Sequence, residues 1–225
     1  KGEFYFAVFE KKGQETGVLL KKLLENVITQ MPWPKSMRWA AYPERWIRPI
    51  HSLVCLFDGV IIPLTYGSQI ANRKTSAHRC LTNAVVEVKD VADYKKSMET
   101  GYVLIDPKDR KAKIKADAEA LAAMKNLYLK DDPILLDEVA SLVEWPVTLM
   151  GNIEDEFLDL PPEVLTATMR KNQKYFALET NDGKLASQFI VVANKETPDG
   201  GAAIIAGNER VLRSRLADAK FFWDQ

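Results

Sequence analysis

The chain contains 225 residues, of which 47% are hydrophobic and 28% are charged, and its 31 basic side chains balance its 31 acidic side chains. This composition is typical of a globular chain that can bury one large core or two small ones. A net charge of zero argues against a free-standing nucleic-acid binder, which normally carries a basic surplus, so any RNA contact must be local. Neither a signal peptide nor a long apolar span is recognised, so we expect no membrane contact.

The first half of the chain predicts one helix and several short strands. Leucines recur at helical spacing after Thr16, which predicts a helix over 18–30 with Thr16 as its cap. Asp58-Gly59 is a dipeptide that accepts the positive φ of a tight turn, so we expect a hairpin there. Strands are expected over residues 4–11, 46–57, 60–66 and 84–89.

The second half predicts longer helices and a sheet. Asp106-Pro107 and Asp132-Pro133 each begin a helix, because aspartate caps helices and proline suits the first helical position. The helices are expected over 107–128, 133–145, 162–171 and 208–225, and the strands over 146–153, 175–180 and 188–193. The fold class predicted for the chain is α+β, with mixed or antiparallel sheets and packed helices.

The last predicted helix carries one charge in an apolar position. At about 100° per residue, Arg215 lies within the arc that includes Leu216 and Phe222. A guanidinium is tolerated there only when a carboxylate or an RNA phosphate meets it. Asp218 is the nearest carboxylate in the sequence, so we expect an internal Arg215–Asp218 ion pair in preference to an RNA contact.

Motifs for catalysis and for metal binding are largely absent from the sequence. The four soft ligands are His51, Cys55, His78 and Cys80. If 46–57 is a strand, His51 and Cys55 stand roughly 13 Å apart at ~3.3 Å per residue, which is too far for one zinc ion. We therefore expect no metal site and no catalytic residue. The two cysteines are too few for a disulfide scaffold and favour a reducing cytoplasm.

Several strings of residues occur in an order that is typical of one protein family. They are Met37-Arg38-Trp39, Trp46-Ile47-Arg48-Pro49-Ile50-His51, Ala77-His78-Arg79, Asp109-Arg110-Lys111-Ala112-Lys113-Ile114, Leu135-Leu136-Asp137-Glu138-Val139-Ala140-Ser141-Leu142-Val143-Glu144-Trp145-Pro146, Gln173-Lys174-Tyr175-Phe176, Gly207-Asn208-Glu209-Arg210-Val211 and Arg215-Leu216-Ala217-Asp218-Ala219. In this order, and over the whole chain, they resemble the beta subunit of bacterial glycyl-tRNA synthetase.

The resemblance implies a cytoplasmic heterotetramer of two alpha and two beta subunits. The alpha subunit would carry the aminoacylation site and use ATP with magnesium, and the beta subunit would supply most of the binding to tRNA(Gly). This chain would support the attachment of glycine to tRNA(Gly) by binding tRNA, by scaffolding the alpha subunit, or by both. The chain itself is expected to hold no cofactor.

The same resemblance implies a fold similar to the editing-module-like domain in the beta subunit of phenylalanyl-tRNA synthetase. The chain would be a single internal region, 1–225, of a larger subunit, with lobes 1–105 and 106–225. The HD-like, body-tail and anticodon-binding parts would be absent. Glycine leaves little to edit, because no smaller amino acid exists, so we expect no hydrolytic site.

Cations near loop-rich segments are the candidates for contacts to the tRNA backbone. For each of them the alternative is a solvated charge or an ion pair. Residues 169–176 are the best single stretch, because they combine cations, amides and an aromatic ring suited to single-stranded ends. The candidates are Arg38, Arg45, Arg48, Arg73, His78, Arg79, Lys171 and Lys174.

A second class of function stays open, namely an autonomous aminoacyl-tRNA editing-type hydrolase working through His51 or His78. Such an enzyme would cleave a mischarged aminoacyl-tRNA without an alpha partner. Spacing identifies no paired acid and base, so the hydrolase is the alternative and not the main expectation.

The chain departs from the family pattern at two alanines. Ala77 precedes His78 where the family usually reads Gly-His-Arg-Phe, and Ala40 follows Met37-Arg38-Trp39 where the family has glycine. If those glycines adopt positive φ, alanine strains both loops.

Overall fold

The computed structural model describes residues 4–10 and 12–225, which fold into two compact units. The first unit contains the described residues up to Ser76 together with Val85–Tyr94, and the second contains Ala77–Ala84 and Lys95–Gln225. The chain therefore passes between the units three times. The lobes 1–105 and 106–225 that the sequence suggests do not coincide with these units.

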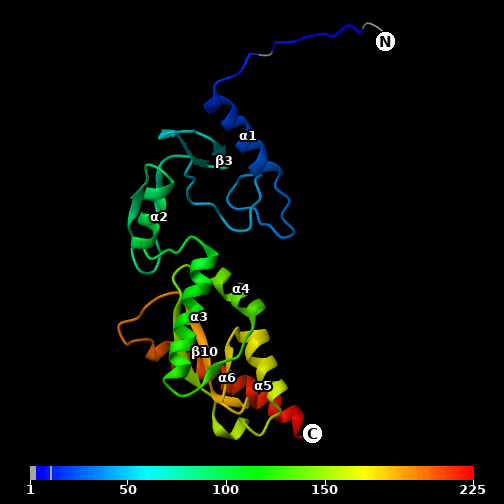
Figure 1. Cartoon of the computed structure of the whole chain (residues 1–225), viewed down its shortest axis with the longest axis vertical. Coiled ribbons are helices and arrows are strands. Elements are labelled where there is room, and N and C mark those ends of the chain that lie inside the picture. Colours follow the sequence, from blue (N-terminus) through cyan, green and yellow to red (C-terminus); the bar gives the residue numbers. More distant parts are fainter. Residues whose placement is uncertain (1–3, 11) are drawn as a thin grey trace. The chain divides into compact units, whose positions relative to one another are not determined.

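The first unit is built from helix α1 and short antiparallel strand pairs (Figure 1). α1 spans Thr16–Gln30 and has no buried residue. The core of this unit is small and contains Ile62, Leu64, Tyr66, Ala71 and Val88. Its strand pairs are β1 (Leu56–Phe57) with β2 (Val60–Ile61), β3 (Thr65–Tyr66) with β4 (Gln69–Ile70), and β5 (Lys74–Ser76) with β6 (Val85–Glu87).

The predicted elements of this unit are only partly confirmed. The Asp58-Gly59 turn joins β1 to β2 with φ angles of 50° and 72°, but each strand has two residues, and the long strands expected on either side of the turn are wrong. α1 begins at Thr16, so Thr16 is a helical residue and not the cap. Residues 4–10 belong to no strand, and position 11, the end of the first predicted strand, lies outside the described residues.

The second unit is organised around a four-stranded antiparallel sheet in the order β7-β9-β10-β8. Most of its elements were predicted, although α3 ends before residue 128 because β7 follows it. α2 begins in the first unit and ends in the second. The elements are α2 (Val91–Thr100), α3 (Pro107–Ala123), β7 (Tyr128–Leu129), α4 (Pro133–Leu142), β8 (Val147–Asn152), a 3-10 turn (Asp155–Phe157), α5 (Pro162–Thr168), a π-helical turn (Met169–Gln173), β9 (Phe176–Glu179), β10 (Leu185–Ala193) and α6 (Ala202–Trp223).

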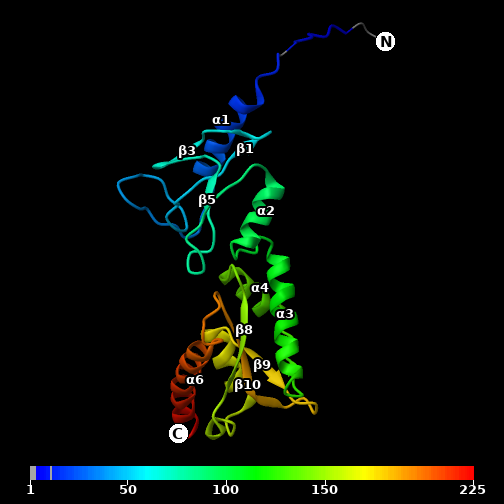
Figure 2. The same cartoon turned by 90° about the vertical axis from the view of Figure 1, so that its left-hand side faces the viewer.

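The sheet of the second unit separates two hydrophobic clusters. One cluster lies between the sheet and helices α3 and α4, and the other lies between the sheet and helices α5 and α6. Successive residues of β9 alternate between them, since Phe176 joins the first cluster and Ala177 the second. Figure 2 shows α3 and α6 on opposite sides of the strands. Helices on both faces explain why β10 contains an almost continuous apolar run.

The prediction for Arg215 is wrong. α6 buries Leu212 and Leu216 in the second cluster, whereas Arg215 is exposed. No ion pair joins Arg215 to Asp218 within residues 4–10 and 12–225. The buried stripe is narrower than the sequence suggests, because Phe222 is 75% exposed and does not extend it. Arg215 therefore faces solvent, where a guanidinium needs no partner.

The start of α6 also differs from the prediction. The helix begins at Ala202 and not at Asn208, which lies inside it. The side chain of Asn208 donates to the carbonyl of Ile204 and accepts a hydrogen bond from the Tyr175 hydroxyl at 2.6 Å. The N-cap residue is Gly201, and Asp199, two residues earlier, supplies the side-chain acceptor for this helix start, since its carboxylate accepts from the Ala203 N–H at 2.8 Å.

The α+β fold class is confirmed by these elements. The sheets are antiparallel, and the one parallel bridge among the described residues joins Val54 to Asn72. Within that part of the chain, no helix combines the length and the hydrophobicity that crossing a bilayer would require. The similarity to an editing module stays a prediction.

Candidate functional site

An aromatic-rich segment of the first unit, residues 33–48, carries three of the candidate arginines. Met37 and Trp46 form an antiparallel bridge with N–H to O distances of 2.8 and 3.1 Å, which closes the loop between them. The Trp46 ring lies edge-on to Trp33 with a centroid distance of 4.8 Å and to Tyr66 at 5.8 Å. The Tyr66 hydroxyl donates to the carbonyl of Arg45 at 2.8 Å. The buried Tyr66 therefore anchors the arginine-bearing segment to the core of the unit.

The arginines of this segment keep an uncompensated charge. Arg45 donates to the hydroxyl and the carbonyl of Ser36, and Arg48 donates to the carbonyl of Ile47. Arg38 is exposed and makes no side-chain hydrogen bond or ion pair within the described residues. Because the acceptors are neutral oxygens, the positive charge stays available to a phosphate.

Arg73 lies elsewhere in the first unit and has a structural contact. Its guanidinium donates to the carbonyl of Gly59 at 3.0 Å, and its own carbonyl accepts from the Val88 N–H at 2.9 Å. Arg73 thus holds the β1–β2 turn while it also lacks an acidic partner in the described chain. It is half-buried, which makes it a weaker candidate for RNA than Arg38 or Arg48.

The basic stretch 169–176 of the second unit is fastened to α4. Arg170 pairs with Asp132, with a distance of 2.5 Å from Nε to Oδ2, and Lys174 pairs with Glu138 at 2.7 Å. The Arg170 hydrogen bond lowers the pKa of Asp132 from its usual range, and Asp132 raises the pKa of Arg170. Asp132 also caps α4 by accepting from the Leu135 N–H at 2.9 Å. These contacts neutralise Arg170 and Lys174, so Lys171 is the cation of this stretch that stays exposed and free of a described partner.

A π-helical turn and a left-handed residue shape the backbone of this stretch. α5 runs into the π-helical turn, a form that is often found at functional sites. Lys174 ends the turn in the left-handed conformation, with φ 59°, and its N–H donates to the carbonyl of Met169. The wider turn separates Lys171 from Lys174 and allows Lys174 to reach Glu138.

His78 and Arg79 differ in environment although they are neighbours. His78 is 1% exposed, and its Nε2 lies 4.0 Å from Oε2 of Glu144. Arg79 is exposed and has no ion pair in the described chain. His78 therefore cannot contact RNA itself, and this part of the predicted interface is wrong. Burial also keeps a substrate from its imidazole, so the pairing with Glu144 does not form an accessible acid–base site.

The residues considered as soft metal ligands are divided between the two units. His51 and Cys55 belong to the first unit, whereas His78 and Cys80 belong to the second. In the part of the chain that the structure describes, no group of three or more His, Cys, Asp or Glu side chains could hold a metal ion. His51 is exposed, and its side chain makes no hydrogen bond in the same range.

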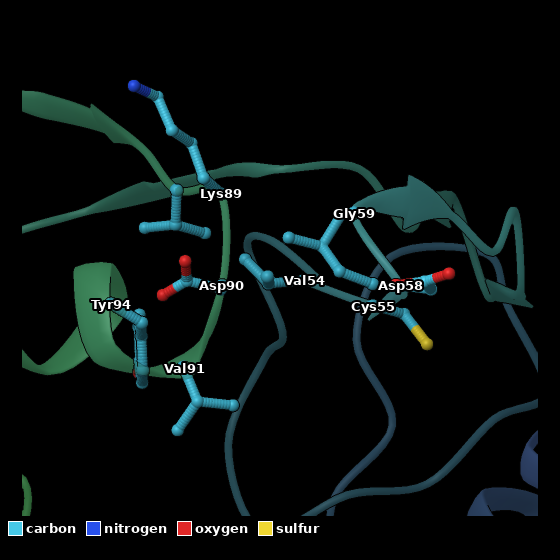
Figure 3. A pocket seen from close by; sticks show the side chains of 10 residues that line it. Val54, Cys55, Asp58, Gly59, Lys89, Asp90, Val91 and Tyr94 are labelled. Atoms are coloured by element: carbon cyan, nitrogen blue, oxygen red, sulfur yellow. The ribbon is translucent and has the colours of Figure 1, made fainter.

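A cavity of about 710 Å³ lies in the first unit, and the candidate Arg73 contacts two residues of its lining, Gly59 and Val88. Figure 3 shows Asp90, Val91 and Tyr94 at its wall, with Lys89 extending outward. The Asp90 carboxylate is already engaged as the cap of α2, because it accepts from the Asp93 N–H at 2.8 Å. Burial raises the pKa of the Cys55 thiol at the opposite wall. The cavity therefore offers neither an available carboxylate from α2 nor an activated thiol.

The two alanine departures have different outcomes. Ala40 has a φ of 52°, so this loop does require positive φ and the alanine strains it, as predicted. Ala77 does not have positive φ, and the prediction for that position is wrong. Ala77 instead restricts its neighbour Gly101, because a Cβ added to Gly101 would lie 2.4 Å from the Ala77 Cβ.

Sequence reasoning missed the acidic partners of the candidates. Glu138 and Glu144 lie within a string that was quoted for the resemblance, but nothing local indicates which cation each would meet. Their partners, Lys174 and His78, are far away in the sequence. The capping pattern of Asp90 and Asp93, by contrast, is a local signal that could have predicted α2.

The structure defines an α+β chain in which arginines that have no ion pair among the described residues lie on and just beyond a loop closed by a backbone bridge. A comparison with known families then gives its affiliation. The family model described as glycyl-tRNA synthetase beta subunit matches residues 1–225, and the chain belongs to this family. The predicted resemblance is thereby confirmed.

Relatives in three organisms support this affiliation. The glycine–tRNA ligase beta subunit of Rhodospirillum centenum is 49% identical over 249 aligned residues, which cover 100% of this chain and 35% of that protein. The beta subunits of Ruegeria sp. and Paracoccus denitrificans are 46% and 42% identical, and the matches cover 100% of this chain and 33% of each relative. The chain spans about a third of the length of the curated relatives that it matches.

Proposed function

We propose that this chain is part of the beta subunit of a glycine–tRNA ligase and helps to attach glycine to tRNA(Gly) by contacting the tRNA backbone. The observation that supports this role is the loop closed by Met37 and Trp46. Arg38 lies within this loop and Arg48 lies just beyond it, and both carry positive charge without an acidic partner among the described residues. Phosphate contacts of this kind position an RNA without reading its sequence. They suit a subunit that holds tRNA while the chemistry occurs elsewhere.

The zero net charge is compatible with this role. Ion pairs neutralise many cations of the second unit, including Lys111 with Asp137 and Lys113 with Asp117. In the first unit, the segment 37–48 contains Arg38, Arg45 and Arg48 with Glu44 as its one acidic residue, so the segment is positive although the chain is neutral. Local contacts of this type weaken as salt rises, because each one releases counterions from the RNA.

The chemistry of ligation is assigned to a partner in this proposal. An alpha subunit would carry ATP and magnesium, within a cytoplasmic assembly of two alpha and two beta subunits. Among the described residues, no group of three or more His, Cys, Asp or Glu side chains could hold a metal ion. No step of the reaction is therefore ascribed to residues of this chain.

Steady-state glycylation by the assembled enzyme tests the proposal. Replacing Arg38 and Arg48 together by glutamine is expected to raise the KM for tRNA(Gly) while kcat and the assembly state stay unchanged, because only binding contacts are lost. Sedimentation of the same variant reports whether the subunits still associate. An unchanged KM for tRNA, or a loss of assembly with no other defect, would favour a purely scaffolding role.

A further inference from the structure

The imidazole of His78 occupies an unusual position in the second unit. The residue is 1% exposed and begins a tight turn that ends at Thr82, whose N–H donates to the His78 carbonyl at 3.0 Å. The N–H of His78 donates to the carbonyl of Gly101 at 2.9 Å. Two backbone hydrogen bonds therefore hold the main chain of His78, independently of any contact of its side chain.

The side chain of His78 accepts hydrogen bonds from the same turn. Its Nδ1 accepts from the N–H groups of Cys80 and Leu81, each at 3.2 Å. These two donors follow Arg79, so the ring bridges the turn beneath that residue. Two backbone groups that a tight turn would leave unpaired are satisfied by one buried acceptor. The conformation at Arg79 consequently depends on the imidazole.

The other ring nitrogen shows which tautomer the site requires. Because Nδ1 accepts two hydrogen bonds, the proton of the neutral ring lies on Nε2. Nε2 is buried without a hydrogen-bond partner, and Oε2 of Glu144 lies 4.0 Å away. The main chain of Glu144 is held by Asn194 and Leu104, at 2.7 and 2.9 Å. The Nε2 proton thus faces a carboxylate on a fixed segment, which favours the ring orientation that supports the turn.

We propose that His78 is a positioning residue that fixes the turn 78–82 and so directs the exposed Arg79 toward a phosphate of the tRNA backbone. The inference rests on the proposed function and adds a second contact area, in the second unit, to the arginine-bearing segment of the first. His78 acts through Arg79 and does not touch the RNA.

Three variants of His78 in the assembled enzyme separate its two nitrogens. His78→Asn places a carbonyl oxygen where it accepts from the N–H groups of the turn, whereas His78→Gln retains a donor near the Nε2 position and loses the acceptor. His78→Leu has neither group. We expect tRNA affinity to be retained in His78→Asn and to fall in both His78→Gln and His78→Leu. If His78→Leu does not fold, the pair of amide variants still gives the comparison.

Arg79→Gln and the double variant His78→Gln/Arg79→Gln complete the test. A tRNA titration at several salt concentrations should show that Arg79→Gln reduces the slope of log affinity against log salt by about 0.7–0.9, the value for one phosphate contact. The double variant should bind no more weakly than Arg79→Gln alone, because His78 acts through Arg79. Additive losses, or a loss in His78→Asn equal to that in His78→Gln, would overturn the proposal.

A failure of the role proposed for Arg79 can be distinguished from a failure of the proposed function. If Arg79→Gln leaves tRNA affinity and salt dependence unchanged, the positioning role for RNA is wrong. The Arg38/Arg48 variant tests the proposed function separately, in the other unit. Amide hydrogen exchange at Cys80 and Leu81 should accelerate in His78→Gln and not in His78→Asn, which confirms that the acceptor was removed as intended.

Discussion

The two units of the chain differ in how they are held together. The second unit has a four-stranded sheet between two hydrophobic clusters, whereas the first has two- and three-residue strands and a helix without a buried residue. Large apolar side chains on α1, such as Leu23 at 58% exposure, face solvent in the first unit. The difference indicates that the second unit supplies most of the stability, while the first presents loops and charge.

The largest expected effect contrasts a phenylalanine from each unit. Phe189 is 0% exposed and stacks on Tyr175 with a centroid distance of 4.6 Å, whereas Phe57 is 46% exposed. Phe189→Ala should lower the free energy of unfolding by about 3–5 kcal/mol, and Phe57→Ala by about 1 kcal/mol or less. Urea unfolding of the chain measures both values.

A second, milder core variant gives a measurable value if Phe189→Ala does not fold. Phe189→Leu retains most of the apolar volume and should cost about 1–2 kcal/mol. Equal losses for Phe57→Ala and Phe189→Ala would show that the first unit is as tightly packed as the second, and the comparison would then be wrong.

A smaller effect is expected where α4 meets the basic stretch. Asp132→Ala removes both the cap on the Leu135 N–H and the partner of Arg170, and should cost about 1–2 kcal/mol. The exposed neighbour Asp131 makes no side-chain hydrogen bond or ion pair among the described residues, so Asp131→Ala is the matched control and should change stability by less than about 0.5 kcal/mol.

The same aspartate gives a pH dependence with a defined sign. Arg170 lowers the folded-state pKa of Asp132 below the ordinary value of 3.8. The stabilisation is therefore complete above that value and is lost as pH falls through the lowered pKa. The stability difference between the wild-type chain and Asp132→Ala should be constant from pH 5 to 7 and shrink below about pH 4. A difference that grows on acidification would contradict the assignment.

The smallest effect is a gain in the first unit. Ala40 has a φ of 52°, and glycine adopts this conformation without strain, so Ala40→Gly should stabilise the loop by about 0.5–1 kcal/mol. Ala41 does not have positive φ, and Ala41→Gly should be neutral or destabilising by up to about 1 kcal/mol. Thermal unfolding, followed by tryptophan fluorescence, compares the stabilities of the two variants. Equal changes in both would contradict the claim that the positive φ of Ala40 strains the loop.

The parts of the fold that sequence predicts are those with local signals. Asp106 and Asp132 cap their helices as expected, because each carboxylate reaches an N–H two or three residues later. The start of α6 was missed because Asp199 is followed by Gly200 and Gly201, which indicate a turn by themselves. The spacing of apolar residues along a helix does not predict a helix start that depends on such a turn.

Contacts between distant residues account for most of the errors at the candidate site. The burial of His78 depends on Gly101 and on the segment that carries Glu144. The neutralisation of Lys174 depends on a helix that lies well before it in the chain. Sequence correctly indicated that Arg38 would lie on a loop, whereas Arg48 was expected in a strand over 46–57 and lies in none. It could not show which cations would find an acidic partner.

The measurement that most directly tests the account is the salt dependence of tRNA(Gly) binding by the assembled enzyme. Arg38→Gln/Arg48→Gln is compared with Lys113→Gln/Lys115→Gln, whose lysines pair with Asp117 and Glu119. We predict that the arginine variant reduces the slope of log affinity against log salt by about 1.4–1.8 and that the lysine variant leaves it unchanged. An unchanged slope in the arginine variant, or equal changes in both, would contradict the account.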